Sequence, residues 1–279
     1  QMYLTAMAAA KPGKHEYEVV AEIMRVAKAN GCDLSFPIIC FVHGETLHNH
    51  QHGNQMQKGD VMVLDSGVET PNKYASDITR TIPVGGAFTS QQRLIYEMVL
   101  RAQIASIKAI KPGVAYKDVH LLAARSFATD LKAAGLMKGD VGEAVAAGAH
   151  ALFFPHGLGH MIGMDVHDLE NIGEQYVGYE PGVERSQQFG LGYLRLARTL
   201  KPGFVLTVEP GLYFIPQLVD QWKAEKKNAA FINYKEVEKF RNARGYRIED
   251  DVLVTKSGNR VLGPPIPKTV ADVEAACRG

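Results

Sequence analysis

The sequence KPGFVLTVE, at residues 201–209, has a counterpart in the first half of the chain, KGDVMVLD at residues 58–65. In both, a turn containing glycine precedes a run of mostly apolar residues, and the run ends on a carboxylate six residues after that glycine. Short apolar runs that follow turn residues are typical of buried strands. The sequence therefore predicts two similar strands that end on Asp65 and Glu209.

A second carboxylate opens a further strand in each half. Asp77 precedes ITRTI at residues 78–82, and Glu249 precedes DDVLV at residues 250–254. The repeated order predicts two related half-domains that each present two carboxylates. Coincidence among common turn-strand patterns is the alternative, and the spacing alone does not decide between them.

The other segments predict a mixture of helices and strands. Apolar residues recur at helical spacing in three stretches, and shorter apolar runs indicate strands, which together favour an α+β domain. The predicted helices cover 14–30, 90–110 and 115–134, the predicted strands cover 36–42, 61–65 and 78–84, and a histidine-rich loop covers 43–59.

Composition is that of an ordinary globular protein. The 279 residues, 46% of them hydrophobic, predict one domain, residues 1–279. The 31 basic and 30 acidic residues nearly cancel, and no block of like charge predicts a nucleic-acid partner. The longest apolar run, residues 36–42, is far shorter than the roughly 20 residues that cross a membrane. Three cysteines without paired spacing predict no disulfide framework, which favours a reducing, cytoplasmic compartment.

Three histidines, His156, His160 and His167, lie within twelve residues among glycine and apolar positions. Histidine binds transition metals, and carboxylates complete sites that suit Mn²⁺, Co²⁺ or Zn²⁺. The alternative is a set of interior histidines satisfied by ordinary hydrogen bonds. The His-Glu-x-x-His and Gly-x-Ser-x-Gly motifs are absent, which excludes the zincin and α/β-hydrolase patterns.

Five segments together resemble a known family, and they are LDSG (64–67), ASDITRT (75–81), HGLGH (156–160), VEPGLY (208–213) and RIEDD (247–251). All five, in this order, are similar to prolidase-type metallopeptidases, which share the pita-bread fold with methionine aminopeptidase and aminopeptidase P. The resemblance covers nearly the whole chain and implies the α+β pita-bread fold of creatinase and the aminopeptidases, with halves related by a pseudo-two-fold axis.

The resemblance implies a site for two divalent metal ions, with Mn²⁺ expected and Co²⁺ or Zn²⁺ as alternatives. By family analogy Asp65 chelates one ion, His160 and Glu209 bind the other, and Asp77 and Glu249 bridge the pair. The implied reaction is hydrolysis of the Xaa-Pro bond by a hydroxide that bridges the metals. Glu209 is expected to take the proton of this nucleophile and pass it to the leaving nitrogen.

The resemblance also implies residues that contact the substrate. His156 and His167 are expected to act in catalysis by donating hydrogen bonds to substrate oxygens, and His48 to face the proline. Arg195 lies fourteen residues before Glu209, where prolidases carry the arginine that clamps the substrate carboxylate. A solvated basic loop is the alternative for Arg195. The expected supports of the metal-binding carboxylates are Tyr213 and Arg247, with ordinary core polarity as the alternative.

Three functions remain in competition at this stage. We expect an Xaa-Pro dipeptidase, while an Xaa-Pro aminopeptidase acting on longer peptides is favoured if Arg195 does not face the site. A metal-free binding module is the third, since the fold is reused without metal. Members of the family carry an additional N-terminal domain, and this chain starts inside the first catalytic helices. We therefore expect that domain to be absent from the chain and the full-length protein to be a homodimer.

Overall fold

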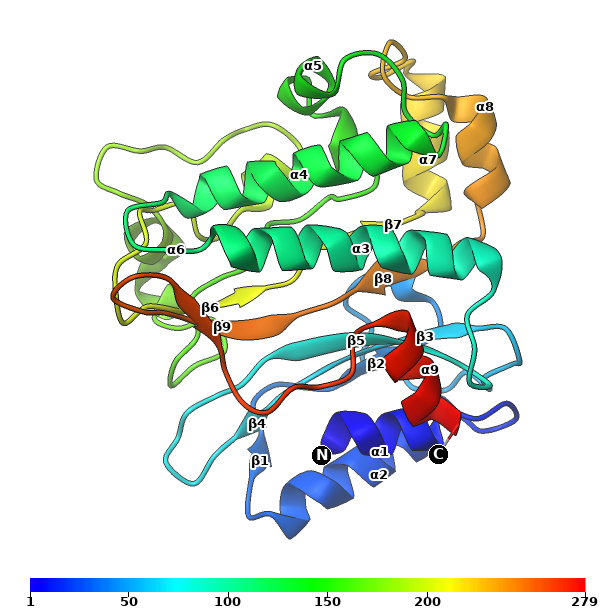
Figure 1. Cartoon of the computed structure of the whole chain (residues 1–279), viewed down its shortest axis with the longest axis vertical. Helices are drawn as coiled ribbons and strands as arrows, with labels where there is room; N and C mark the ends of the chain where they lie inside the picture. Colours follow the sequence, from blue (N-terminus) through cyan, green and yellow to red (C-terminus); the bar gives the residue numbers. More distant parts are fainter. Residues whose placement is uncertain (279) are drawn as a thin grey trace.

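The computed structural model describes residues 1–278, and its main strands form two similar antiparallel sheets (Figure 1). In the first sheet Asp65 is paired with Thr79, and in the second Val208 is paired with Asp250. The first sheet has the order β2-β3-β5, from Ile39–Phe41, Val61–Ser66 and Ile78–Pro83, and the second has the order β10-β9-β6, from Asn259–Val261, Asp250–Val254 and Val205–Val208.

The two sheets meet where Thr79 of β5 pairs with Glu249, the residue that precedes β9. These residues form an antiparallel bridge in which the Glu249 N–H donates to the Thr79 carbonyl at 3.0 Å. Arg80, only 1% exposed, reinforces the junction by donating from Nη1 to the Glu249 carbonyl at 2.6 Å and from Nη2 to Asp250 at 2.7 Å. The carboxylate-bearing segments of the two halves are therefore held next to each other.

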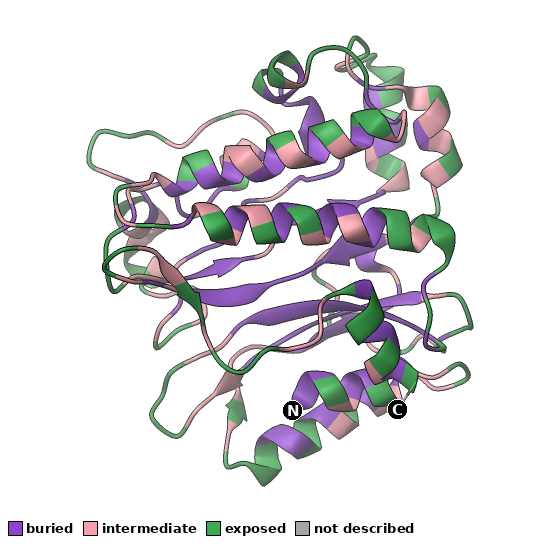
Figure 2. Cartoon of the chain, viewed as in Figure 1, coloured by how far each residue is buried: buried purple, intermediate pink, exposed green. Residues whose placement is uncertain are grey.

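A pair of helices belongs to each half. Figure 1 shows α1 and α2 on one side of the strands and α3 and α4 on the other. Each helix has a buried face and an exposed face, α2, α3 and α4 are amphipathic, and the strands themselves are largely buried (Figure 2). The helices are α1 (Met2–Ala9), α2 (Glu16–Ala29), α3 (Ser90–Ala109) and α4 (Tyr116–Ala133).

The internal repeat extends to the links between these helices. The sequence Lys-Pro-Gly occurs at 11–13 and again at 111–113, and in each case a helix begins shortly afterwards. Gly13 and Gly113 both have positive φ, +89° and +85°, which favours glycine. Their N–H groups donate to Met56 and Leu200, at 2.8 and 2.9 Å. Equivalent turns thus attach each helical pair to the segment that leads into β3 or β6, although the sequence analysis did not recognise this repeat.

Smaller elements complete the fold and surround the strand ends. Two short sheets pair β1 with β4 and β7 with β8. No helix within the described residues 1–278 is both long and apolar enough to span a membrane. The remaining elements are β1 (Asp33–Leu34), β4 (Val68–Glu69), α5 (Val141–Ala146), α6 (Glu170–Gly178), β7 (Gly211–Tyr213), α7 (Pro216–Ala224), α8 (Tyr234–Val237), β8 (Gly245–Arg247) and α9 (Val270–Arg278), with 3₁₀ turns at Gly44–Thr46, Ala149–Leu152, Leu191–Tyr193 and Glu238–Phe240.

Two buried histidines lie outside the predicted site. His120 and His150 are each 1% exposed, and none of their ring nitrogens has a hydrogen-bond partner among residues 1–278. Burial lowers the pKa of His120 to about 3 and that of His150 to about 4. Both rings are therefore neutral in the folded protein at neutral pH.

These histidines predict acid sensitivity. Because their folded-state pKa values lie below the ordinary 6.5, the unfolded chain binds protons that the folded chain excludes, so the free energy of unfolding falls as pH drops from 6.5 toward 4. We expect His120→Leu to lose less stability than wild type between pH 7 and pH 5. Urea unfolding at both pH values measures the difference, and an equal loss in the two proteins would contradict the prediction.

Candidate metal centre and adjoining cavity

Five predicted ligands converge where the two sheets meet. Asp77, His160 and Glu249 are buried, and one ligand atom of each lies within 4.8 Å of the others. The Nε2 atom of His160 lies 3.4 Å from Asp77 Oδ2 and 3.9 Å from Glu209 Oε1. Asp65 contacts Asp77 from the neighbouring strand. The structure therefore brings together all five residues that the sequence analysis nominated.

Several oxygens in this cluster are buried without a partner. Asp65 Oδ1, Asp77 Oδ1 and Glu249 Oε1 have no hydrogen-bond partner among residues 1–278. The same holds for Asp251 Oδ1, while Asp251 Oδ2 accepts the N–H of Asp77 at 3.1 Å. Burying unpaired carboxylate oxygens is costly, and hard or borderline divalent cations are the groups that such oxygens bind. The donor set fits a carboxylate-rich metal centre.

The electrostatics of the cluster lead to the same conclusion. Burial raises the pKa of Asp77 well above its ordinary value, and the charges of Asp65 and Glu209 raise it further. Burial also raises the pKa of Glu249, with additional repulsion from Asp77 and Glu209. Divalent cations would offset this repulsion and favour the ionised carboxylates.

His160 is oriented for ligation by its own backbone neighbourhood. Its Nδ1 lies 3.0 Å from the Met161 carbonyl, and its backbone N–H donates to Thr207 Oγ1 at 3.2 Å. A carbonyl accepts only from a protonated nitrogen, so Nδ1 carries a proton, and Nε2, which faces the carboxylates, is the nitrogen available to a metal. A neutral imidazole with its proton on Nδ1 binds a metal through Nε2.

Arg247 contacts a carboxylate of the cluster directly, and Tyr213 contacts Arg247. Arg247 Nη2 pairs with Asp65 Oδ2 at 2.5 Å, Nη1 donates to the Tyr213 hydroxyl at 2.9 Å, and Nε donates to Thr79 Oγ1 at 3.2 Å. The Thr79 hydroxyl in turn donates to Glu249 Oε2 at 2.6 Å. The sequence analysis did not identify Thr79, although it lies two residues after Asp77 within a quoted motif.

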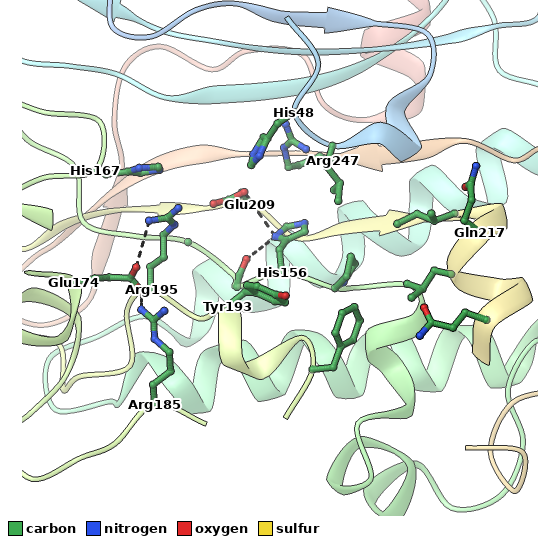
Figure 3. Close-up of a pocket in the computed structure, with 18 residues that line it drawn as sticks. His48, His156, His167, Glu174, Arg185, Tyr193, Arg195, Glu209, Gln217 and Arg247 are labelled. Carbon is green, nitrogen blue, oxygen red and sulfur yellow. Dashed lines mark hydrogen bonds and ion pairs between the residues drawn. The ribbon is translucent and has the colours of Figure 1, made fainter. Parts of the chain in front are cut away.

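A cavity of about 660 Å³ opens beside the cluster (Figure 3). Glu209, His48, His156, His167 and Arg195 all line it. Burial lowers the pKa of His48, and burial lowers the pKa of both His156 and His167 to about 3. The predicted substrate residues therefore share one cavity, and its three histidines are neutral at neutral pH.

His156 and His167 differ in their remaining hydrogen-bonding capacity. His156 Nδ1 lies 2.7 Å from the Gly157 carbonyl, and Nε2 lies 3.0 Å from the Tyr213 hydroxyl. Both nitrogens of His156 are thus engaged by the protein itself, which leaves no N–H directed at a substrate. His167 packs edge-on against His160, with 4.4 Å between ring centroids, and is half-exposed to the cavity.

Arg195 is neither a fully solvated residue nor an unpaired one. Its Nη1 pairs with Glu170 at 2.5 Å and approaches Glu174 at 3.5 Å, and both carboxylates come from α6. Glu174 also pairs with Arg185 (Figure 3). Arg195 therefore lines the cavity in a fixed position, with Nε and Nη2 making no hydrogen bond to other described residues.

His48 is presented by a strained turn that sequence patterns do not predict. Leu47 has φ +71° and ψ −64°, and the His48 N–H donates to the Thr46 carbonyl at 3.0 Å across it. This γ-turn is rare for a residue with a side chain, and such a conformation costs about 1–3 kcal/mol. Both Leu47 and His48 line the cavity. Two other histidines of the loop bond elsewhere, His43 to Arg244 and His52 to the Ile38 carbonyl.

Comparison with known proteins identifies the family. The model of metallopeptidase family M24 matches residues 1–256. The chain belongs to metallopeptidase family M24. The Xaa-Pro dipeptidase of Homo sapiens is 41% identical and aligns with 98% of this chain and 55% of its own length. The probable Xaa-Pro aminopeptidase of Verticillium alfalfae is 36% identical, covering 93% of this chain and 55% of that protein.

Solved M24 structures confirm the pita-bread fold. Aminopeptidase P of Escherichia coli, in a structure with the inhibitor Pro-Leu, has a TM-score of 0.79 and 34% identity, covering 99% of this chain and 55% of that chain. Aminopeptidase PepP of Pseudomonas aeruginosa gives the same four values. The chain thus spans about half the length of the relatives it matches.

Proposed function

We propose that residues 1–279 are the catalytic domain of a metal-dependent peptidase that hydrolyses the bond before proline, with Xaa-Pro dipeptides as substrates. The observation that carries this proposal is the convergence of unpartnered carboxylate oxygens and His160 Nε2 beside a cavity that also contains Arg195. Membership of family M24 and the names of its relatives support the reaction class.

We assign the metal centre to Asp65, Asp77, His160, Glu209 and Glu249. The proposed occupants are two divalent ions, Mn²⁺ in preference to Co²⁺ or Zn²⁺, because the donor set is dominated by oxygen. Such ions lower the pKa of water and polarise the scissile carbonyl when bound. Arg247, through Asp65, and Thr79, through Glu249, would keep two of the ligands in position.

Glu209 is the proposed general base and acid. Its side chain is 21% exposed and lines the cavity, in contrast to the more deeply buried Asp77 and Glu249. It can therefore take a proton from the attacking water and deliver it to the leaving nitrogen of proline. His167 is the proposed donor to a substrate oxygen, and His156, held between Gly157 and Tyr213, is proposed to orient Tyr213.

Arg195 is proposed to bind the terminal carboxylate of the dipeptide. The pairing of Nη1 with Glu170 restricts the guanidinium and leaves Nε and Nη2 for a bidentate carboxylate contact. His48 is proposed to face the proline ring. An Xaa-Pro bond has no N–H on its proline nitrogen, so recognition has to rest on the ring and on the carboxylate.

Replacing Arg195 with Ala tests the dipeptide assignment. We expect kcat/KM for Ala-Pro to fall by about 10- to 100-fold, because a charge-assisted hydrogen bond contributes about 1.5–3 kcal/mol, while Ala-Pro-Ala loses little. Steady-state kinetics on both peptides with Mn²⁺-loaded protein measures the split. Equal losses on the two peptides would reject the carboxylate contact, and a wild-type preference for the tripeptide would favour an Xaa-Pro aminopeptidase.

Two properties of the full-length protein are also proposals. We propose a homodimer located in the cytoplasm, where the three cysteines, none of which forms a disulfide within the described residues, would stay reduced. Sedimentation of the full-length protein tests its oligomeric state.

A further inference from the structure

Tyr3 reaches from α1 to the two strands that adjoin Asp65 and Asp77. The residue is buried, with 5% of its surface exposed, and Figure 1 shows α1 beside the first sheet. The Tyr3 hydroxyl lies 2.8 Å from the Ser66 carbonyl and also contacts the Ile78 carbonyl. The Ser66 N–H donates to the same hydroxyl at 3.1 Å. One side chain therefore bonds the backbone of both strands.

The backbone groups that Tyr3 contacts are next to two of the proposed metal ligands. Ser66 directly follows Asp65 on β3. Ile78 directly follows Asp77 and opens β5, and the two strands pair Ser66 with Ile78. A hydroxyl has one proton and two lone pairs, so this hydroxyl can accept the Ser66 N–H and donate to a carbonyl of either strand. Its position therefore fixes the spacing of the two strand ends.

The second half of the chain has a buried polar side chain at the matching position. Tyr3 of α1 and Gln103 of α3 each lie eight residues before a Lys-Pro-Gly sequence. Gln103 is fully buried, and its Nε2 donates to Asp250 Oδ2 at 2.8 Å. Asp250 directly follows Glu249, another proposed ligand. Each half thus places one helix side chain against a residue adjacent to a ligand.

We propose that Tyr3 is a positioning residue of the metal centre, and that its hydroxyl sets the distance between Asp65 and Asp77. This inference rests on the proposed function, in which both carboxylates bind metal. Groups that hold ligands in place keep a site formed before the metal arrives, and they contribute to metal affinity in this way. Phenylalanine at position 3 would keep the ring in the core and remove the link between the two strand ends. The alternative is a hydroxyl that only stabilises the fold.

Titration of the metal-free protein with Mn²⁺ tests the role of Tyr3. We expect Tyr3→Phe to weaken Mn²⁺ binding by about 10- to 100-fold, the usual cost of losing a group that orients metal ligands. Tyr17→Phe is the matched control, because it removes the hydroxyl of a tyrosine on α2 that is 53% exposed, and it should bind Mn²⁺ as wild type does. Isothermal titration calorimetry gives the affinity and the stoichiometry without any turnover.

Urea unfolding separates positioning from a general contribution to stability. Mn²⁺ raises the free energy of unfolding by an amount that depends on its affinity for the folded protein. A positioning role predicts that Tyr3→Phe gains less stability than wild type from the same Mn²⁺ concentration, in addition to any loss without metal. A variant that is less stable without metal but gains as much from Mn²⁺ as wild type would overturn the inference.

The wild-type titration shows which proposal fails. If wild type binds Mn²⁺ and Tyr3→Phe binds it equally tightly, the positioning role is overturned while the proposed metal centre stands. If wild type binds no Mn²⁺, the proposed function is overturned, and this inference with it. Weaker binding by Tyr3→Phe, with Tyr17→Phe unchanged, supports the inference.

Discussion

Glu209→Gln is expected to lower kcat for Ala-Pro by at least about 10² to 10⁴, the usual contribution of a general acid-base group. Glutamine has nearly the same shape but cannot take a proton, and it is also a weaker metal ligand. The change removes one of several mutually repelling carboxylates, because Glu209 contributes to the raised pKa of both Asp77 and Glu249. The thermal midpoint of the metal-free variant should therefore be no lower than that of wild type.

Steady-state kinetics with saturating Mn²⁺ and thermal unfolding without metal measure the two effects. Glu143→Gln is the matched control, since it makes the same chemical change at an exposed carboxylate in the first turn of α5. A Glu209→Gln enzyme that retains more than about a tenth of wild-type kcat would exclude the proposed proton transfer.

Arg247→Met is expected to destabilise the metal-free protein by about 3–5 kcal/mol, the usual cost of removing one partner from a buried ion pair. Arg247 is 3% exposed, and its guanidinium bonds Asp65, Tyr213 and Thr79 at once. Without Arg247, the buried carboxylate cluster loses the positive charge of the guanidinium that contacts Asp65. Added Mn²⁺ should recover part of the lost stability, because the ions supply positive charge to the same carboxylates.

Urea unfolding with and without Mn²⁺ measures this effect. Arg260→Met, at an exposed position of β10, is the control for loss of an arginine. If Arg247→Met lowers the free energy of unfolding by less than about 1 kcal/mol, the Arg247–Asp65 pair contributes no more than an exposed ion pair does. That result would contradict the supporting role of Arg247.

The strand ends were predictable because their chemistry is local. An apolar run that stops on a carboxylate needs no tertiary information, and Asp65 and Glu209 were found in this way. The strand predicted over 36–42 is shorter in the structure, Ile39–Phe41, because Pro37 has no N–H for a ladder and the chain pairs only after it. The repeated Lys-Pro-Gly turns are visible in the sequence, but they contain no candidate catalytic or metal-binding residue. Their equivalence is shown only by the matching hydrogen bonds of Gly13 and Gly113 in the structure.

The features that sequence patterns missed depend on contacts between distant segments. Thr79 acts through a hydrogen bond to Glu249, 170 residues away, and no spacing rule reports such a pair. Leu47 has a positive φ, which residues with a side chain disfavour. Backbone propensity therefore predicts a negative φ at this position. Arg195, predicted to bind the substrate carboxylate, lines the cavity, but its pairing with Glu170 on α6 depends on how that helix packs.

The most direct test of the central claim is the metal content of the purified chain together with its Ala-Pro hydrolysis, before chelation, after chelation and after reconstitution with Mn²⁺. The proposed metal centre predicts about two ions per chain and activity that disappears with the metal and returns with it. A chain that binds no divalent ion, or that cleaves Ala-Pro equally well after complete removal of metal, would contradict the claim.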